Sequence, residues 1–152
     1  MIARLGPLSA ERFGEARTLV GAVERPRELL ERAAVDGGSR ETQAVAAYDD
    51  TGAVSGIALF GEVAGTLGAG VLLWTVVRPD VRRTGVARAL VDRAVTELHA
   101  GGARVIVAEV PGSASFGAAL QLLTACGFRR ESEVPDFYGT GVPLVLLGHR
   151  LE

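Results

Sequence analysis

The sequence predicts an α/β (α+β) fold with a mixed, mostly antiparallel sheet and one parallel βαβ unit at its centre. Three consecutive segments carry this prediction: an apolar run at 71–77, an amphipathic helical pattern at 85–100 and a second apolar run at 104–110. A right-handed crossover through the helix makes the two flanking strands parallel. Segments on both sides of this unit have the turn signals of hairpins, whose strands pair antiparallel. Because no internal repeat or low-complexity linker divides the chain, we expect residues 1–152 to form a single domain.

The N-terminal part of the chain predicts one strand, two helices and a hairpin. Ser9 is the expected N-cap of the first helix, because apolar residues follow it at helical spacing. Pro26 suits the first turn of the second helix, and Gly37 and Gly38 are expected to end that helix. The residues Asp-Asp-Thr-Gly at 49–52 lie between two β-rich runs, which is a hairpin signature. In chain order, the expected elements are a strand at 2–5, helices at 9–23 and 26–35, and hairpin strands at 43–48 and 53–60.

The second half of the chain predicts the central unit and a closing hairpin. The run at 71–77 contains only apolar residues and Thr, which is typical of a strand buried on both faces. After Pro79 the pattern becomes helical, with apolar residues at i, i+4 steps from Val86 to Leu98, and Gly101 ends it. The remaining expected elements are a helix that starts at Ser113 or Ser115 and ends at Cys126 before Gly127, and strands at 129–138 and 142–151.

Composition limits the classes of partner. The chain has 16 Lys or Arg and 18 Asp or Glu, so its formal net charge is −2. Such a chain offers no strong basic field to nucleic acid or to an anionic membrane. All of its basic residues are Arg. Any cationic contact would therefore be a planar guanidinium group, which suits phosphate.

Cysteine, histidine and hydropathy patterns limit the location and the chemistry. The lone Cys126 excludes an internal disulfide, and the N-terminus has no apolar leader, so we expect a cytoplasmic protein. Glycines interrupt the apolar stretch at 53–77, which therefore indicates strands rather than a membrane span. His99 and His149 are far apart without clustered ligands, so no metal site is expected.

The turn between the central strand and the following helix predicts an anion-binding site. Gly85 allows close backbone approach, and the helix begins directly after it. The N–H groups at a helix start have no intrahelical acceptor and lie at the positive end of the helix dipole. Such groups can hold a phosphate, and Arg82, Arg83 and Arg88 add positive charge. The alternative is an ordinary βα turn with solvated arginines.

Four motifs resemble those of one family. The run R-x-x-G-x-A at 82–87 is similar to the Q/R-x-x-G-x-G/A acyl-CoA signature of the GNAT superfamily of N-acetyltransferases. The V-x-P at 77–79 resembles the strand end of that family, and the GF at 127–128 resembles the end of its fourth helix. The tail at 136–147 resembles its final hairpin, so the resemblance covers roughly residues 70–152.

The resemblance implies a fold, a co-substrate and a set of binding residues. The two central strands would splay to admit acyl-CoA, with helices on both faces of the sheet. Acetyl-CoA would donate its acetyl group to a primary amine that attacks directly in a ternary complex. The pantetheine would pair with the strand edge at Val76 and Val77, where a main-chain amide would meet the oxyanion. The diphosphate would lie on the expected cofactor-binding residues Arg82, Arg83, Thr84, Gly85, Val86, Ala87 and Arg88. The identity of the amine cannot be read from the sequence.

Three positions depart from the GNAT pattern. Arg83 stands where the family usually has Gly, which adds a phosphate contact or only a solvated side chain. In the fourth helix, Phe116 occupies the usual Asn position and Leu123 the usual Tyr position. The usual tyrosine general acid is therefore missing.

Two residues are candidates for proton transfer. An amine resembling lysine has a pKa of about 10.4, so it must lose a proton before it attacks. Glu109 ends its strand beside the expected cleft and is the candidate base, acting through a water. Its Glu-Val pair resembles that of family members that acetylate ribosomal-protein N-termini. Tyr138 is a candidate proton donor. The alternatives are an exposed strand-end glutamate and a tyrosine with a packed ring and a wet hydroxyl.

Other interpretations remain open at this point. Ser115, Asp136 and His149 follow the Ser…Asp…His order of a small serine hydrolase. Cys126 with His149 is a second nucleophile pair, although Cys126 ends an apolar helix. A CoA-binding module that has lost catalysis is a third interpretation, since the tyrosine acid is missing. The helix at 114–126 has few polar residues, which favours a homodimer that covers it.

Overall fold

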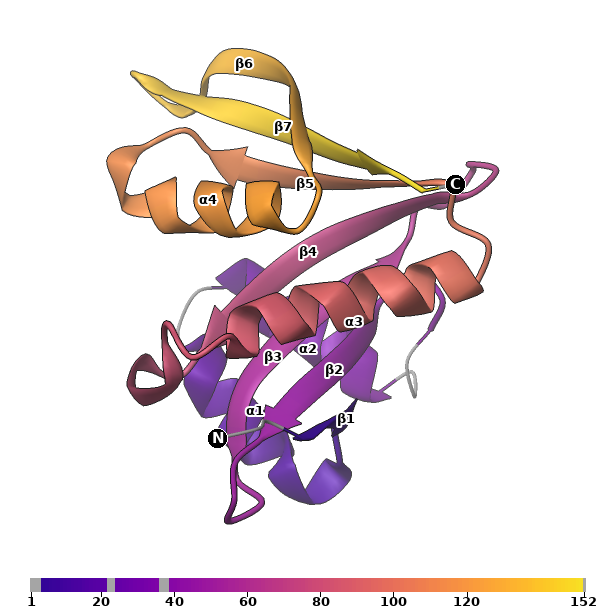
Figure 1. Ribbon diagram of the computed structural model, residues 1–152, viewed down its shortest axis with the longest axis vertical. Coiled ribbons are helices and arrows are strands. Elements are labelled where there is room, and N and C mark those ends of the chain that lie inside the picture. Colours follow the sequence, from indigo (N-terminus) through magenta and orange to yellow (C-terminus); the bar gives the residue numbers. More distant parts are fainter. Residues whose placement is uncertain (1–3, 22–23, 36–38, 152) are drawn as a thin grey trace.

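Seven strands form one mixed sheet in the order β1-β2-β3-β4-β5-β7-β6 (Figure 1). The computed structural model describes residues 4–21, 24–35 and 39–151. The strands are β1 (Arg4–Pro7), β2 (Gln43–Tyr48), β3 (Val54–Glu62), β4 (Ala69–Val77), β5 (Val105–Pro111), β6 (Arg129–Gly139) and β7 (Val142–Arg150). The helices are α1 (Phe13–Val20), α2 (Glu24–Val35), α3 (Val86–Ala100) and α4 (Gly117–Ala125), with short 3-10 turns at Ala10–Arg12, Pro79–Val81 and Ala114–Phe116.

The pairing of the strands confirms the predicted fold class. Among the described strands, β4 and β5 pair in parallel, and all other neighbours pair antiparallel. Helix α3 connects β4 to β5, as the βαβ pattern predicts. Helices α3 and α4 lie on one face of the sheet, and α1 and α2 lie on the other (Figure 1). Two apolar cores result, one around Leu90 and Ile106 and one around Leu30 and Ile57.

The two parallel strands separate after a short stretch of pairing. Their register runs from Ala69 opposite Val105 to Leu72 opposite Ala108, and no pair follows. Beyond Leu72 the two strands diverge (Figure 1). The prediction that the run at 71–77 is buried on both faces is therefore wrong. Only Gly70 and Leu72 of β4 are buried, because one edge of the strand has lost its neighbour.

A β-bulge interrupts β4 at the point where the strands separate. Leu59 of β3 lies opposite Trp74 and Phe60 lies opposite Leu72, so Leu73 is the extra residue. The bulge changes which side chains share a face. Leu72 packs in the core below α3, whereas both Leu73 and Trp74 pack on the core below α1 and α2.

Several N-terminal boundaries differ from the prediction. The first strand extends to Pro7, whose carbonyl accepts a hydrogen bond from the Tyr48 hydroxyl at 2.7 Å. Ser9 makes no side-chain cap, because a 3-10 turn separates it from the start of α1 at Phe13. Helix α2 begins at Glu24, two residues before its predicted start. The expectations for Ile2, Val23, Gly37 and Gly38 fall outside the described residues.

The fourth helix also starts later than predicted. Neither Ser113 nor Ser115 caps α4, because a 3-10 turn comes first and the two hydroxyl groups lie 3.0 Å from each other. Gly127 has a φ of 99°, which ends the helix as predicted. Only Leu123 of α4 is buried, so its outer apolar surface is not covered within the described part of the chain.

Candidate functional site

The loop between β4 and α3 has a backbone shape that suits an anion. Arg83 has a φ of 64° and Gly85 a φ of 90°, so two left-handed residues lie close together before the helix. Successive N–H groups in such conformations converge on one point and form a concave anion site. A left-handed conformation costs a residue with a side chain about 1 kcal/mol. This cost explains why glycine is usual at the Arg83 position in the family pattern.

The start of α3 leaves several main-chain donors without intrahelical acceptors. The first helical hydrogen bond runs from the Ala89 N–H to the Gly85 carbonyl at 3.0 Å. The N–H groups at 86–88 therefore precede the intrahelical ladder and point toward the loop. Thr84 is held by its hydroxyl, which donates to the Val81 carbonyl, and Val86 is anchored in the core. The donors are thus fixed in place at the positive end of the helix.

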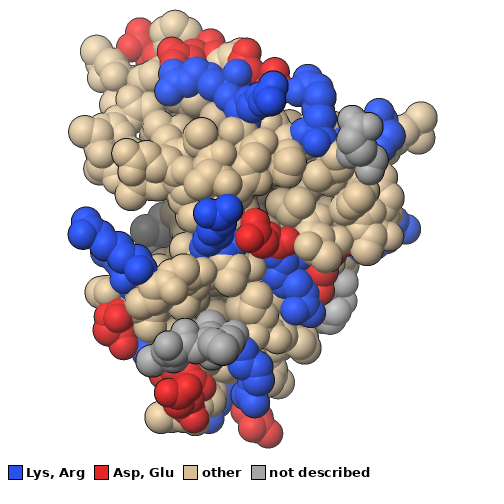
Figure 2. All heavy atoms as spheres, viewed as in Figure 1, with Lys and Arg blue, Asp and Glu red and all other residues tan. Residues whose placement is uncertain are grey.

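Arginine side chains surround these donors. Arg82 and Arg83 are exposed and have no carboxylate partner among the described residues. Arg88 lies 4.0 Å from Asp92, and its Nη2 donates to the Ala125 carbonyl at 3.4 Å. In the view of Figure 2, positive side chains gather at the hollow between the α3 and α4 parts of the molecule. Two of the three predicted arginines are therefore free to meet a phosphate.

Arg78, which the sequence reasoning missed, fixes the start of this loop. Its guanidinium group donates to Asp49 and Asp80, both at 2.8 Å, and so joins the loop to the turn between β2 and β3. Hydrogen bonds from the Thr51 hydroxyl and from Arg78 hold the pKa of Asp49 well below its usual range. The bonds to Asp80 and Asp49 raise the pKa of Arg78. A charge pattern could not have shown this, because the two aspartates lie in different turns.

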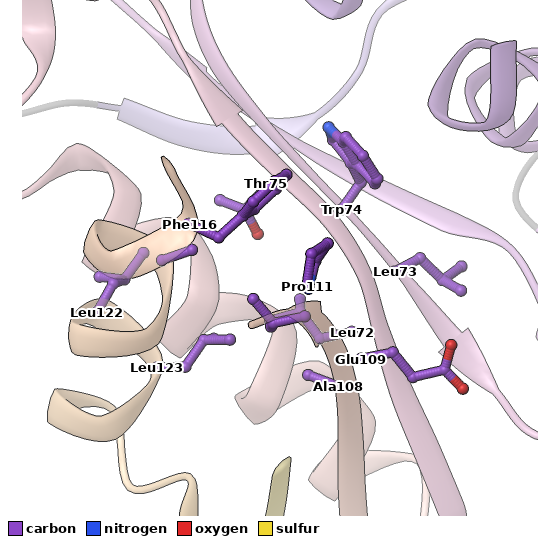
Figure 3. A pocket seen from close by; sticks show the side chains of 12 residues that line it. Leu72, Leu73, Trp74, Thr75, Ala108, Glu109, Pro111, Phe116, Leu122 and Leu123 are labelled. Carbon is purple, nitrogen blue, oxygen red and sulfur yellow. The ribbon is translucent and has the colours of Figure 1, made fainter. Parts of the chain in front are cut away.

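A narrow cavity of about 170 Å³ opens on the α4 side of the cleft (Figure 3). Thr75 lines it, and the hydroxyl oxygen of Thr75 is buried without a hydrogen-bond partner among the described residues. Leu123, at the missing tyrosine position, lines the same cavity as Thr75. The lining residues are Leu72, Leu73, Trp74, Thr75, Ala108, Glu109, Val110, Pro111, Phe116, Ala119, Leu122 and Leu123. An unpaired hydroxyl in an apolar site has a free energy cost that a hydrogen-bonding ligand removes.

A larger cavity of about 440 Å³ opens on the opposite side of the cleft. It is lined by Val71, Leu72, Leu73, Trp74, Glu109, Pro111, Phe137 and Tyr138. Glu109 lines both cavities, and its side chain points away from α4 (Figure 3). This direction follows from strand alternation, because its neighbours Ala108 and Val110 are buried in the core below α3. The structure thus brings both candidate proton-transfer residues, Glu109 and Tyr138, to one cavity.

The serine hydrolase residues do not come together. The Ser115 hydroxyl pairs with Ser113, and Asp136 accepts a hydrogen bond from the Gly141 N–H at 2.7 Å. His149 packs against Phe128, with 5.3 Å between the ring centroids and an angle of 54° between the ring planes. His149 lies opposite Ile106 near the start of β5, whereas Ser115 follows the end of that strand. At about 3.3 Å per strand residue, this separation excludes a Ser-His contact.

Cys126 is not a nucleophile either. Burial, with a smaller contribution from Asp92, raises the pKa of its thiol to about 11. The thiolate that a nucleophilic cysteine needs is therefore disfavoured at neutral pH. The structure supports its assignment as a residue of the apolar core.

Two absences concern only the part of the chain that the structure describes. Across 4–21, 24–35 and 39–151, no group of His, Cys, Asp and Glu side chains is arranged to hold a metal ion. Within the same ranges, none of the helices has the length and hydrophobicity that a membrane crossing needs.

The comparisons with known proteins agree with this geometry. The model of the acetyltransferase (GNAT) family matches residues 11–128, and no curated protein matches the chain. A solved GNAT-family protein from Desulfovibrio desulfuricans has a TM-score of 0.88 and 21% identity, over 98% of this chain and 99% of that chain. The ribosomal-protein-S18-alanine N-acetyltransferase from Escherichia coli has a TM-score of 0.78 and 17% identity, over 99% and 95% of the two chains.

A third structure adds a ligand. The protein yncA from Salmonella typhimurium, solved with its cofactor acetyl-CoA, has a TM-score of 0.77 and 16% identity, over 100% of this chain and 95% of that chain. At these identities the solved structures show the fold, and the family match over most of the sequence shows the class of enzyme. The chain is therefore a member of the acetyltransferase (GNAT) family, a family of N-acetyltransferases that use acetyl-CoA.

Proposed function

We propose that this chain, acting as one domain, transfers an acetyl group from acetyl-CoA to a primary amine by direct attack in a ternary complex. One observation carries the proposal: a carboxylate, Glu109, lies where a cavity on the α4 side meets a cavity on the other side of the cleft. An acyl donor in the first cavity and an amine in the second would meet beside this carboxylate. Direct attack requires such a meeting point and no protein nucleophile.

The cofactor would follow the loop and the free edge of β4. The donors at 86–88, with the N–H groups of Arg83 and Gly85, would hold the diphosphate, and the side chains of Arg82 and Arg83 would add charge-assisted contacts. The N–H groups of Arg82 and Thr84 already donate to the carbonyls of Pro79 and Val81. The pantetheine would pair with β4 at Val76 and Val77 in place of the strand neighbour that is missing there. A main-chain amide near these residues would stabilise the oxyanion that forms during attack.

Proton transfer would then need one base and little acid catalysis. Glu109 would take a proton from the ammonium group, directly or through a water, so that the free amine attacks the thioester carbon. The carbon–sulfur bond breaks, and the coenzyme A thiol, with a pKa of about 8.5, leaves as a thiolate. The nitrogen releases its second proton as the amide forms, and the thiolate takes up one proton in turn. Tyr138, on the same cavity, is the candidate that would donate a proton to it.

The buried hydroxyl of Thr75 gives a specific prediction about the cofactor. We expect Thr75→Val to raise the melting temperature by a few degrees, because it removes an unpaired polar group worth about 1 kcal/mol. The same change should weaken acetyl-CoA binding about tenfold, since the hydroxyl would pair with a polar group of the pantetheine. Thermal unfolding and calorimetric titration measure the two effects.

A matched control for this variant is Thr96→Val. The Thr96 hydroxyl donates to the Asp92 carbonyl on the exposed side of α3, so its loss should leave cofactor affinity unchanged. If Thr75→Val binds acetyl-CoA as tightly as the unmodified protein, the hydroxyl does not face the cofactor.

The proposed reaction is tested by two measurements on one preparation. Calorimetry measures acetyl-CoA binding, and a thiol reagent then measures coenzyme A release with a panel of primary amines. We expect micromolar binding and amine-dependent release. Binding without release for any amine would contradict the transfer reaction. Light scattering on the same sample tests the homodimer proposed from the uncovered surface of α4. The proposed location of the protein is the cytoplasm.

A further inference from the structure

The cavity on the α1 and α2 side of the sheet has a lining that selects its ligand. We infer that the acceptor is a small primary monoamine with an apolar, ring-sized body and no carboxylate. This inference rests on the proposed function and names the substrate class of the same site. A volume of about 440 Å³ is in the range of small-molecule pockets.

The bulge in β4 forms one wall of this cavity. In a regular strand, Leu73 and Trp74 would point to opposite faces of the sheet. The extra residue in β4 directs both side chains to the face of α1 and α2, where they line the cavity together. Trp74 is the single tryptophan of the chain, and its ring is a large flat surface against which an apolar group can pack.

The tail strand forms the opposite wall. Phe137 and Tyr138 of β6 both line the cavity, and their rings meet edge to face with centroids 5.0 Å apart. Phe137 is nevertheless 56% exposed and Tyr138 46% exposed. Two aromatic rings left exposed beside a cavity form an apolar surface that a ligand can cover.

The charges of the lining limit the polar part of the ligand. Among the described residues that line this cavity, Glu109 is the only charged one. One ammonium group can pair with its carboxylate. A second ammonium or a carboxylate on the ligand would have no such partner, and an unpaired charge against apolar groups is costly. The geometry therefore points to one positive charge at Glu109 and an apolar body between Trp74 and Phe137.

The test compares kcat/KM for four acceptors of different chemistry. The probes are phenethylamine, ethanolamine, spermidine and phenylalanine, each with saturating acetyl-CoA. We expect phenethylamine to exceed each of the others at least tenfold, because only this probe buries a ring without a second charge. If ethanolamine, spermidine or phenylalanine is equal or better, the inference is wrong while the transfer reaction stands. Acetyl-CoA binding without thiol release for any of the four probes also overturns the inference, and the transfer reaction itself is contradicted only if the wider panel of primary amines gives no release either.

A pair of variants on one strand connects the preference to the cavity. Phe137→Ala is expected to raise KM about tenfold for phenethylamine, while KM for acetyl-CoA stays unchanged. Val134→Ala is the matched control, since Val134 is on the same strand and 47% exposed but does not line the cavity. Equal KM values for the two variants would overturn the inferred position of the apolar body.

Discussion

Replacing Glu109 by glutamine is expected to lower kcat at pH 7 by about 100-fold or more, which is the usual contribution of a general base. Glu109 is the one carboxylate that lines both cavities among the residues that the structure describes. The change removes its charge and leaves the size of the side chain almost unchanged. Without it, only the small fraction of acceptor that is already deprotonated at pH 7 can attack. The protein should still bind acetyl-CoA, because the change leaves the main-chain donors proposed for the diphosphate at 86–88 untouched.

The pH dependence separates this role from a structural one. An acceptor amine with a pKa of about 10.4 deprotonates as the pH rises, so the need for a base disappears. The deficit of Glu109→Gln should therefore shrink steadily between pH 7 and pH 10. Glu97→Gln on α3 is the control, because Glu97 pairs with Arg93 on the other face of the sheet, and it should behave like the unmodified protein. A Glu109→Gln variant with full activity at pH 7 would exclude this residue as the base.

Replacing Gly85 by alanine is expected to weaken acetyl-CoA binding about 100-fold, which corresponds to about 2.7 kcal/mol. A Cβ at this position would meet no protein atom within 4 Å, so the substitution causes no clash within the chain. The substitution is expected to weaken binding for two reasons. A φ of 90° strains alanine, and the added methyl group occupies open space beside the donors at 86–88, where the diphosphate would lie.

Gly141 provides a matched control for the backbone strain. It has a φ of 78° in the turn between β6 and β7, and a Cβ there also meets no atom within 4 Å. Gly141→Ala should therefore lower the melting temperature by about as much as Gly85→Ala, and leave acetyl-CoA affinity unchanged. Calorimetry measures the acetyl-CoA affinity of both variants, and thermal unfolding measures their melting temperatures. Equal affinities in the two variants would show that Gly85 has no special relation to the cofactor.

The central unit of the fold was predictable because its signals are local. The strand, the Gly85 turn and the helix from Val86 to Ala100 are neighbours in sequence, and their periods and caps can be read directly. The same is true of the donors at 86–88, which exist wherever a helix starts. The separation of the two central strands was predicted from the family resemblance, because no periodicity in the sequence indicates it.

Features that depend on strand partners were not predictable in the same way. The run at 71–77 looks like a fully buried strand, yet its exposure depends on where β5 stops pairing, at Leu72. The bulge at Leu73 depends on how β3 aligns with β4, which the composition of β4 does not show. Thr75 is the one polar residue in the apolar run at 71–77, and this position was the feature of the sequence that could have indicated its proposed contact with the cofactor.

The residues of the larger cavity could not be grouped from the sequence either, because they are far apart along the chain. It joins Trp74 of β4, Glu109 of β5 and Phe137 of β6, which only the strand order brings together. Sequence reasoning selected Glu109 and Tyr138 singly. It could not show that aromatic residues line the same cavity as the carboxylate, and hence could not suggest a class of acceptor.

A crystal structure of the chain with coenzyme A tests the central claim most directly. We predict diphosphate oxygens at about 2.7–3.2 Å from the main-chain nitrogens at 85–88, with the pantetheine beside Thr75 and Val77 along the free edge of β4. A coenzyme A molecule whose diphosphate lies away from this loop, or whose pantetheine lies outside the β4–β5 cleft, would contradict the account.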